Sequence, residues 1–288
     1  MSSSVTATCP FCDSPAAVAF VKEGCDICDC SACGHRFAAL ELSPRHVDTV
    51  YGDDYFTAGG AGYEDYLAEG DLLRAHGKRY ADLLTKYTPP GTMLDVGAAA
   101  GFIMRGFADG GWTVSGVEPN AMMAHHAQSQ FGFDVAVGSL EQYQSDTQFD
   151  LVSMIQVVGH FYDIRAAFEK ASRLLCPGGF LLIESWDQGS WPARLLGEGW
   201  HEYSPPSVVH WFTPERLANH LAAFGFQEVA RGKPKKRLNG AHAKSLVGHK
   251  IADMPLSSVM QAGLKLVPDN LIIPYPAFDL FWGLYQRQ

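Results

Sequence analysis

Apolar and polar positions along the middle of the chain follow two alternating periods. Short apolar runs typical of buried strands occur at 93–96, 112–118, 135–137, 149–155 and 180–184. Apolar residues recur at helical spacing between and around these runs, at 67–87, 102–108, 121–131 and 164–175. A further helix begins at Thr213-Pro-Glu and ends at Gly225. Strands that alternate with helices predict an open, mostly parallel α/β sheet with helices on both faces.

The two ends of the chain depart from this alternation. We expect residues 1–40 to form a cysteine-rich module and residues 41–90 to hold an aromatic segment and the first helix. Residues 91–231 would be the α/β core. Residues 232–288 would contribute a basic insert and, from Ala277 onward, a strand that closes the sheet.

Composition narrows the possible classes of protein. The 288 residues are 47% hydrophobic, which supports a sizeable core and excludes a disordered chain. A net charge of −9 disfavours a broad surface for nucleic acid or anionic lipid. We see no leader peptide at the start and no apolar run of the ~18 residues that a membrane span needs. These features predict a cytoplasmic protein without a membrane span, in which clustered cysteines indicate metal binding rather than disulfides.

A turn of small residues follows the first strand of the core. Leu94-Asp95-Val96-Gly97-Ala98-Ala99-Ala100-Gly101-Phe102 leads from a strand into a helix, so a ligand can approach the backbone and meet unpaired N–H groups. Glu118 ends the next strand, where its carboxylate can accept both hydroxyls of a ribose.

This stretch resembles motif I of the class I S-adenosylmethionine (SAM) methyltransferases. Its spacing is G-x-A-x-G rather than the G-x-G-x-x-G of dinucleotide sites, and Asp95 precedes it. Glu118-Pro-Asn, Gly138-Ser-Leu-Glu and Pro177-Gly-Gly follow in the order that the family shows. The resemblance extends from about residue 67 to the C-terminus and implies a Rossmann-like, seven-stranded methyltransferase sheet.

The resemblance also implies a set of SAM-binding positions. Gly97 and Gly101 would line the methionine part of SAM, and Ala99 stands where the family often has glycine. Asp95 would hold the loop, or the amino group of SAM through water, and Glu118 would bind the ribose.

Other positions extend this set. Ser139 and Leu140 would flank the adenine, or simply form a turn. Gln156 would begin the loop under the sulfonium. Tyr55 lies in the aromatic segment, which in similar proteins covers the SAM pocket and whose simpler role is packing.

Two C-x-x-C pairs near the N-terminus suit a metal. Cys9 and Cys12, with Cys30 and Cys33, could supply four thiolates to a tetrahedral structural zinc, around which so small a module would fold. Cys25-Asp-Ile-Cys28 is a rival for the second pair, although no glycine follows it. Free thiols that merely cluster are the alternative.

Two histidines are candidates for a general base. His160 lies in the loop after the fourth strand, and His210 follows the fifth, so both face the predicted ligand edge of the sheet. Imidazole titrates near neutral pH and suits proton transfer, although loop histidines more often lie on the surface or cap an element.

These patterns predict a SAM-dependent methyltransferase. It would transfer a methyl group by in-line displacement to a sugar, a glycan or a small metabolite. One alternative is an RNA methyltransferase that contacts RNA through the basic stretch Arg231–Lys250. Outside that stretch only 15 basic residues (22 − 7) face 31 acidic ones, which makes a nucleic-acid partner a poor fit. The other alternative is a partner protein that binds SAM without catalysis.

Overall fold

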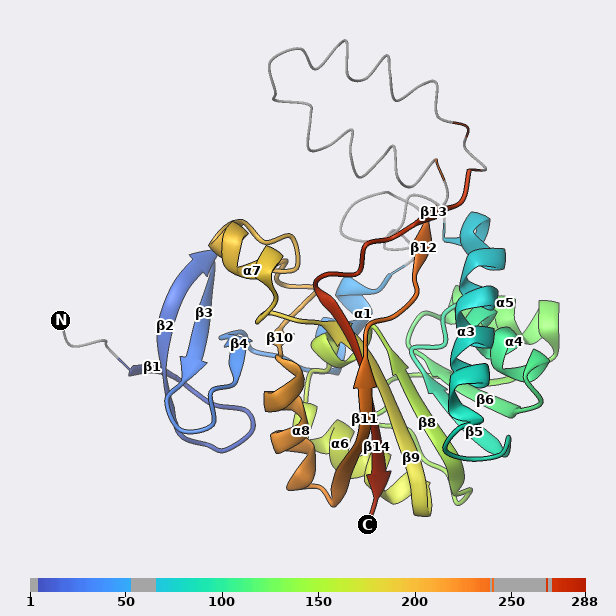
Figure 1. Cartoon of the computed structure of the whole chain (residues 1–288). Helices are drawn as coiled ribbons and strands as arrows, with labels where there is room; N and C mark the ends of the chain where they lie inside the picture. The colour runs from blue at the N-terminus through green and yellow to red at the C-terminus, as the bar shows by residue number, and fades with distance from the viewer. Residues whose placement is uncertain (1–4, 53–65, 239, 241–267, 269–270) are drawn as a thin grey trace.

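The computed structural model describes residues 5–52, 66–238, 240, 268 and 271–288 (Figure 1). The candidate Tyr55 and most of the basic stretch after Arg237 therefore lie outside the described residues. The described residues form sheets of seven, five and two strands. The two-stranded sheet pairs β12 (Arg237–Leu238) with β13 (Ile273–Pro274).

The seven-stranded sheet has the order β11-β14-β9-β8-β5-β6-β7. Its parallel strands are β5 (Thr92–Val96), β6 (Thr113–Glu118), β7 (Asp134–Val137), β8 (Phe149–Ile155) and β9 (Leu175–Trp186). β14 (Leu280–Arg287) runs antiparallel between β9 and β11 (Phe226–Gly232). This topology confirms the predicted Rossmann-like, seven-stranded sheet, including the closing strand β14 near the C-terminus.

Helices cover both faces of this sheet because its strands are apolar on both sides. Met93 of β5 packs into a cluster with α3 (Gly70–Leu84) and α4 (Phe102–Asp109). The next residue, Leu94, points to the opposite face and packs with α6 (Ile164–Leu174) and α8 (Pro214–Ala222). The turn η1 (Leu67–Glu69) precedes α3, and α5 (Ala121–Phe131) connects β6 to β7. Figure 1 shows the two helix layers on either side of the sheet.

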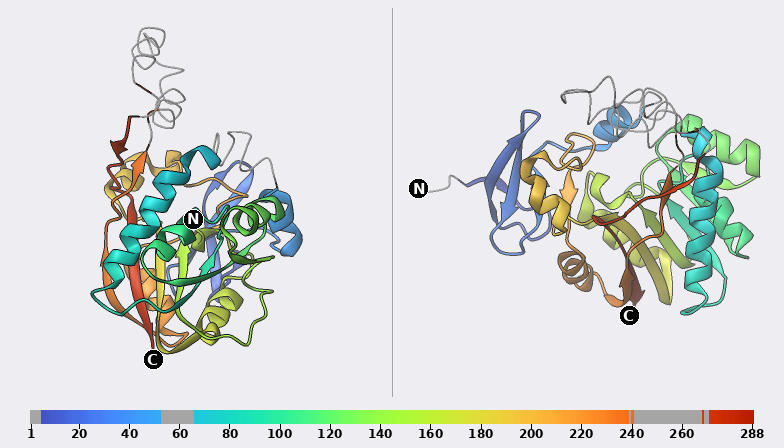
Figure 2. Two further views of the ribbon diagram at one scale, coloured as in Figure 1. Left: turned by 90° about the vertical axis from the view of Figure 1, so that its right-hand side faces the viewer. Right: turned by 45° about the horizontal axis from the view of Figure 1, so that its top comes forward.

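The five-stranded sheet joins two distant parts of the sequence. β1 (Val5–Thr8), β2 (Pro15–Lys22), β3 (Cys25–Cys30) and β4 (Arg36–Ala38) form an antiparallel unit at the N-terminus, which we call the ribbon. The fifth strand, β10 (His210–Trp211), comes from the core and pairs with β4. The two views in Figure 2 show the ribbon beside the main sheet, with α7 (Trp191–Leu196) close to it.

Short elements complete the fold. α1 (Pro44–Val50) follows the ribbon, η2 (Val158–His160) follows β8, and η3 (Gly197–Gly199) follows α7. The predicted cap of α8 is present, because the Thr213 hydroxyl accepts a hydrogen bond from Arg216 N at 3.2 Å. None of the helices that the structure describes has the length and apolar character to cross a membrane.

Candidate active site

The turn after β5 has the backbone that its glycines favour. Gly97 and Gly101 adopt φ of 70° and 82°, the left-handed region in which side chains are strained. A Cβ on Gly97 would lie 2.6 Å from Val157 Cγ2, so no side chain fits there without displacing the loop after β8. The turn therefore keeps a concave backbone surface at the carboxyl edge of the sheet.

The backbone of Ala99 adopts a conformation that a residue with a side chain rarely takes. Its φ is 45°, so the position favours glycine for its backbone conformation as well as for space. Its N–H donates to Glu118 Oε2 at 2.8 Å, which helps to hold the strained backbone. The substitution of alanine for the glycine that the family often has here therefore leaves the backbone strained.

Two buried acidic residues, Asp95 and Glu118, lie next to this turn. Glu118 accepts hydrogen bonds from the amides of Ala99 and Asn120, and Asp95 accepts one from the Ser153 hydroxyl. Burial raises the pKa of Asp95 to about 7, against the effect of Ser153 and with a contribution from the Glu118 charge. Burial also raises the pKa of Glu118 to about 7, although its two amide donors oppose the shift. Each Glu118 oxygen retains a lone pair that could accept a ribose hydroxyl.

The remaining predicted SAM positions lie at the ends of neighbouring strands. Ser139 and Leu140 follow β7, and Gln156 follows β8. Both Ser139 and Leu140 are buried, and the Ser139 hydroxyl makes no hydrogen bond within the described residues. A buried hydroxyl without a partner fits a site that a polar ligand completes. We call the edge formed by residues 95–101, 118, 139–140 and 156 the cofactor edge.

Gln156 is held in an unusual conformation beside Glu184. Its φ is 61°, its N–H donates to the Glu184 carbonyl, and its Nε2 donates to Glu184 Oε1 at 2.8 Å. His76 and Tyr80 of α3 also hydrogen-bond to the Glu184 carboxylate. Burial raises the pKa of Glu184, but the charge and hydrogen bond of His76, with help from Lys236 and Tyr80, outweigh burial and hold it at about 2. A strained residue fixed by a buried charge is typical of a functional position.

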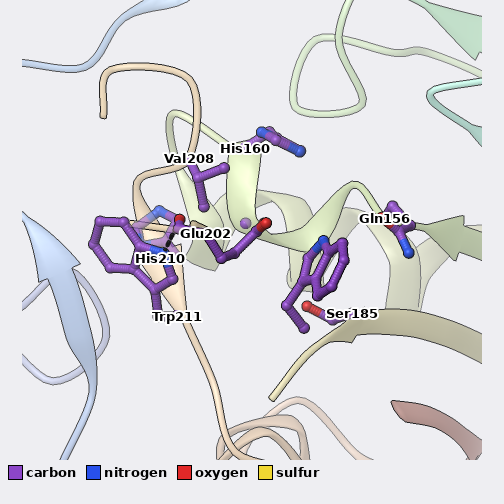
Figure 3. A pocket seen from close by; sticks show the side chains of 9 residues that line it. Gln156, His160, Ser185, Glu202, Val208, His210 and Trp211 are labelled. Carbon is purple, nitrogen blue, oxygen red and sulfur yellow. Dashed lines mark hydrogen bonds between the residues drawn. The ribbon is translucent and has the colours of Figure 1, made fainter. Parts of the chain in front are cut away.

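A small pocket adjoins the cofactor edge at Gln156. Figure 3 shows Gln156 and Ser185 on one side of it and His210 and Trp211 on the other, with Glu202 between them. We call it the acceptor pocket, and its lining residues are Gln156, Gly159, His160, Ser185, Trp186, Glu202, Val208, His210 and Trp211.

His160 is anchored in this pocket through its ring nitrogen Nδ1. Its Nδ1 lies 2.8 Å from the Ser207 carbonyl and 2.7 Å from the Tyr51 hydroxyl. A carbonyl can only accept, so Nδ1 carries the proton and Nε2 keeps its lone pair. Burial lowers the pKa of His160, against the hydrogen bonds to the backbone of Ser207 and Gln156. The neutral form of His160 is therefore favoured at pH 7.

His210 also lines the pocket, but both of its nitrogens are occupied. Nε2 lies 3.0 Å from the Phe161 carbonyl and must donate to it, so Nδ1 accepts from His35 Nε2 at 3.1 Å. Burial lowers its pKa to about 4. Since neither nitrogen is free to take a proton from a ligand, this geometry favours His160 over His210 as a general base.

The sequence reasoning missed two carboxyl groups. Burial raises the pKa of Glu202, with a contribution from the Asp279 charge and against that of Lys236, and the residue lines the pocket. Glu184 was overlooked although it ends the apolar run Phe180-Leu-Leu-Ile-Glu, as Glu118 ends β6. An acid at the end of a buried parallel strand was the available signal. No comparable pattern marked Glu202.

Tyr51 connects the two halves of the site. Its carbonyl accepts from Asn120 Nδ2 beside the cofactor edge, and its hydroxyl donates to the Ser207 carbonyl beside His160. The aromatic segment thus reaches both regions through this residue, whereas Tyr55 lies outside the described residues.

The four cysteines of the favoured set converge in the ribbon. The Sγ atoms of Cys9, Cys12, Cys30 and Cys33 all lie within 4.8 Å of one another. Two of the Sγ pairs are 3.5 Å apart, close to the ~3.8 Å edge of a tetrahedron with Zn–S bonds of about 2.3 Å. Amide N–H groups of Phe11 and Cys33 point at two of these sulfurs. The rival Cys25 instead lies near the Glu23 carbonyl, at 3.9 Å.

The chain is similar to known methyltransferases in its sequence and in its fold. The sequence pattern of a family described as "Methyltransferase domain" matches residues 69–230. A ubiquinone biosynthesis O-methyltransferase of Rhodopseudomonas palustris (strain BisB5) is 27% identical over 145 residues, which are 46% of this chain and 57% of that relative. The chain thus matches little more than half the length of that curated relative.

Solved structures show the same fold at low identity. The 1,6-didemethyltoxoflavin-N1-methyltransferase of Burkholderia thailandensis, with bound S-adenosylhomocysteine, is similar over 94% of this chain and 99% of its own, with a TM-score of 0.53 and 15% identity. The magnesium protoporphyrin IX methyltransferase of Synechocystis PCC 6803, with bound S-adenosylhomocysteine (SAH), is similar over 84% and 100%, with a TM-score of 0.51 and 14% identity.

Proposed function

The chain belongs to the methyltransferase domain family of SAM-dependent enzymes, and from this premise we propose that it methylates a hydroxyl group on a small ring-shaped molecule, such as a sugar or another small metabolite. The observation that carries the proposal is a pocket that shares Gln156 with the cofactor edge and also contains His160. The curated relative's name, a ubiquinone biosynthesis O-methyltransferase, supports a small-molecule acceptor.

The residues of the acceptor pocket suit a hydroxylated ring. Trp186 and Trp211 offer aromatic faces, while Gln156, Ser185 and Glu202 offer hydrogen-bonding groups. A sugar or a phenol presents both an apolar face and hydroxyl groups. We do not favour RNA, because Arg231 is paired with Glu228 and Glu215, which leaves it poorly placed to contact phosphate.

The pocket also supports a division of roles during the reaction. SAM, when bound, supplies a methyl group that its sulfonium already activates. His160 Nε2 would accept the proton of the acceptor hydroxyl as the oxygen attacks, with Nδ1–H anchored on Ser207. Glu202 and Gln156 would orient the acceptor.

The proposal is tested by incubating the protein with methyl-labelled SAM and three acceptor classes. These are nucleotide-linked sugars, catechols and purified ribosomal RNA, with SAH affinity measured in parallel by calorimetry. We expect SAH binding and label in a small hydroxylated molecule. Label in RNA alone would replace this function by the RNA alternative. SAH binding with no label in any class would favour the non-catalytic one.

We further propose that Cys9, Cys12, Cys30 and Cys33 hold one structural zinc ion. The convergence of four thiols, with backbone amides aimed at two of them, supports this assignment. Elemental analysis of the purified protein should find about one zinc per chain, and Cys30→Ser should reduce it, whereas Cys25→Ser should not. Wild-type protein without zinc would contradict the assignment.

A further inference from the structure

The outer wall of the acceptor pocket is tied to the ribbon by backbone hydrogen bonds. β10, which contains the lining residues His210 and Trp211, pairs with β4 and not with the seven-stranded sheet. The pairing register is His210 with Phe37 and Trp211 with Arg36, and Ala38 N donates to the Val209 carbonyl at 2.9 Å. The core holds the same segment from the other side, where Val209 N donates to the Gly159 carbonyl at 2.8 Å, so the ribbon is one of two supports of this wall.

Two side chains of the ribbon strengthen this attachment. The Arg36 guanidinium donates to the Tyr203 hydroxyl at 2.6 Å, beside the lining residue Glu202. Asp29 on β3 holds the same guanidinium through two hydrogen bonds of 2.7 and 2.6 Å. The second contact is His35 Nε2, which meets His210 Nδ1 at 3.1 Å in the buried interior. Bidentate, partly buried arginine contacts are among the more strongly directional in proteins.

An apolar cluster fills the space between the ribbon and the segment that carries the wall. Ile27 and Ala38 of the ribbon pack there with residues of 193–211, which are Ala193, Trp200, Tyr203, Val208, Val209 and Trp211. Phe20 of β2 adds an edge-on contact with Tyr203, with ring centroids 4.9 Å apart. This interface is packed like an interior, so the ribbon and the wall are expected to move together.

The same contacts begin next to the cysteine cluster. Cys30 N donates to the His35 carbonyl, and Gly34 N donates to the Cys30 carbonyl, which closes the turn between the cluster and β4. A fixed cluster geometry thus sets where β4 begins, and β4 helps to set where β10 lies.

We propose that the ribbon is a positioning element of the acceptor site, which holds the wall formed by residues 202–211 through Arg36 and His35. The use of that pocket by the acceptor rests on the proposed function. The attachment of the wall to the ribbon does not rest on the proposed function, because it follows from the contacts between them. Arg36 and His35 are positioning residues, because they reach the pocket only through Tyr203 and His210.

The first test is Arg36→Met in the full-length, metal-containing protein. It removes the hydrogen bonds to Tyr203 and Asp29 and keeps the length of the side chain. Amide hydrogen exchange should rise in peptides covering 198–212, and the KM for the acceptor should rise about tenfold. SAH affinity, zinc content and exchange over 92–101 should stay unchanged. Arg36→Lys should recover part of the loss.

Arg165→Met is the matched control. Arg165 of α6 also joins the core to the ribbon, through Asp13 at 2.8 Å, and this ion pair involves no residue of the wall. It should change neither the exchange over 198–212 nor the KM. Tyr203→Phe removes the acceptor of the Arg36 hydrogen bond from the core side, so it tests the same contact without disturbing the ribbon.

Each outcome decides the proposal. Unchanged exchange over 198–212 in both Arg36→Met and Tyr203→Phe would overturn it, and this readout needs no acceptor. Increased exchange with an unchanged KM would overturn the positioning role. Loss of SAH affinity in Tyr203→Phe would overturn a role confined to the acceptor site. An inactive wild type that still shows the expected exchange would refute the proposed function and leave the attachment standing.

Discussion

The cofactor edge and the acceptor pocket meet at Gln156 but are built in different ways. The cofactor edge lies at the ends of adjacent parallel strands, and its residues fall between 95 and 156 in chain order. The acceptor pocket combines residues of 156–160, 185–186 and 202–211, and its outer wall is held by residues near 29–36. A strand-end site is therefore set by local sequence, whereas the pocket depends on contacts across nearly the whole chain.

The largest expected effect concerns the cofactor edge. Gly97→Arg should abolish SAH binding, a loss of more than about a thousandfold, because a side chain at φ of 70° must displace Val157 and fill the turn. Calorimetry measures the affinity, and thermal unfolding checks that the variant folds. Gly199→Ala, at a glycine with open space around its Cβ position, should bind SAH normally. Unchanged affinity in Gly97→Arg would remove the cofactor site from this turn.

The second prediction tests the acceptor side alone. His160→Gln should lower kcat by about 10²–10⁴-fold and leave SAH affinity intact, because the general base is lost and the cofactor edge is not touched. Burial lowers the pKa of His160 below 6.5, so the neutral base persists as pH falls and wild-type activity should decline only below that value. A pH–rate profile of kcat measures this. His125→Gln, on α5, serves as the control. A decline centred above pH 7 would contradict the role of His160.

The third prediction concerns the junction between the two regions. Glu184→Gln should destabilise the fold by about 3–5 kcal/mol, because it leaves His76 and Tyr80 buried without their charged partner. Glu169→Gln, which breaks only an exposed pair with Arg173, should cost less than about 1 kcal/mol in urea unfolding.

The same carboxylate predicts how stability depends on pH. The pKa of Glu184 falls from 4.5 to about 2 on folding, so its contribution is complete above pH 4.5 and is lost as pH falls toward 2. Glu184→Gln should flatten that part of the wild-type stability curve. Equal acid sensitivity in both proteins would mean that other groups control it.

The smallest expected effect is at Ala99. Ala99→Gly should stabilise the protein by about 1 kcal/mol, because glycine adopts φ of 45° without strain. Ala100→Gly, next to it in an ordinary conformation, should destabilise it instead. Chemical unfolding of the two variants compares them directly. Destabilisation by both would show that the turn is not strained at Ala99.

The two regions also differ in how far the sequence alone could predict them. The sequence predicts the order of strands and helices, the glycine turn and the convergence of the four cysteines, because each depends on periodicity or on spacing within a few residues. The strand β10 could not be predicted from the sequence. Two residues carry no periodic signal, and they form a strand only because β4 offers them an edge. The roles of the histidines could not be predicted from the sequence either, since the Phe161 carbonyl and His35 occupy the two ring nitrogens of His210.

The pairing of β4 with β10 also bears on how the chain is synthesised. The ribbon is synthesised before β10, so β4 remains an uncovered edge until residues 210–211 have been made. An uncovered edge can pair with other chains, so the nascent protein carries this hazard through most of its translation. A fragment that ends after residue 40 would carry it permanently and should be prone to self-association.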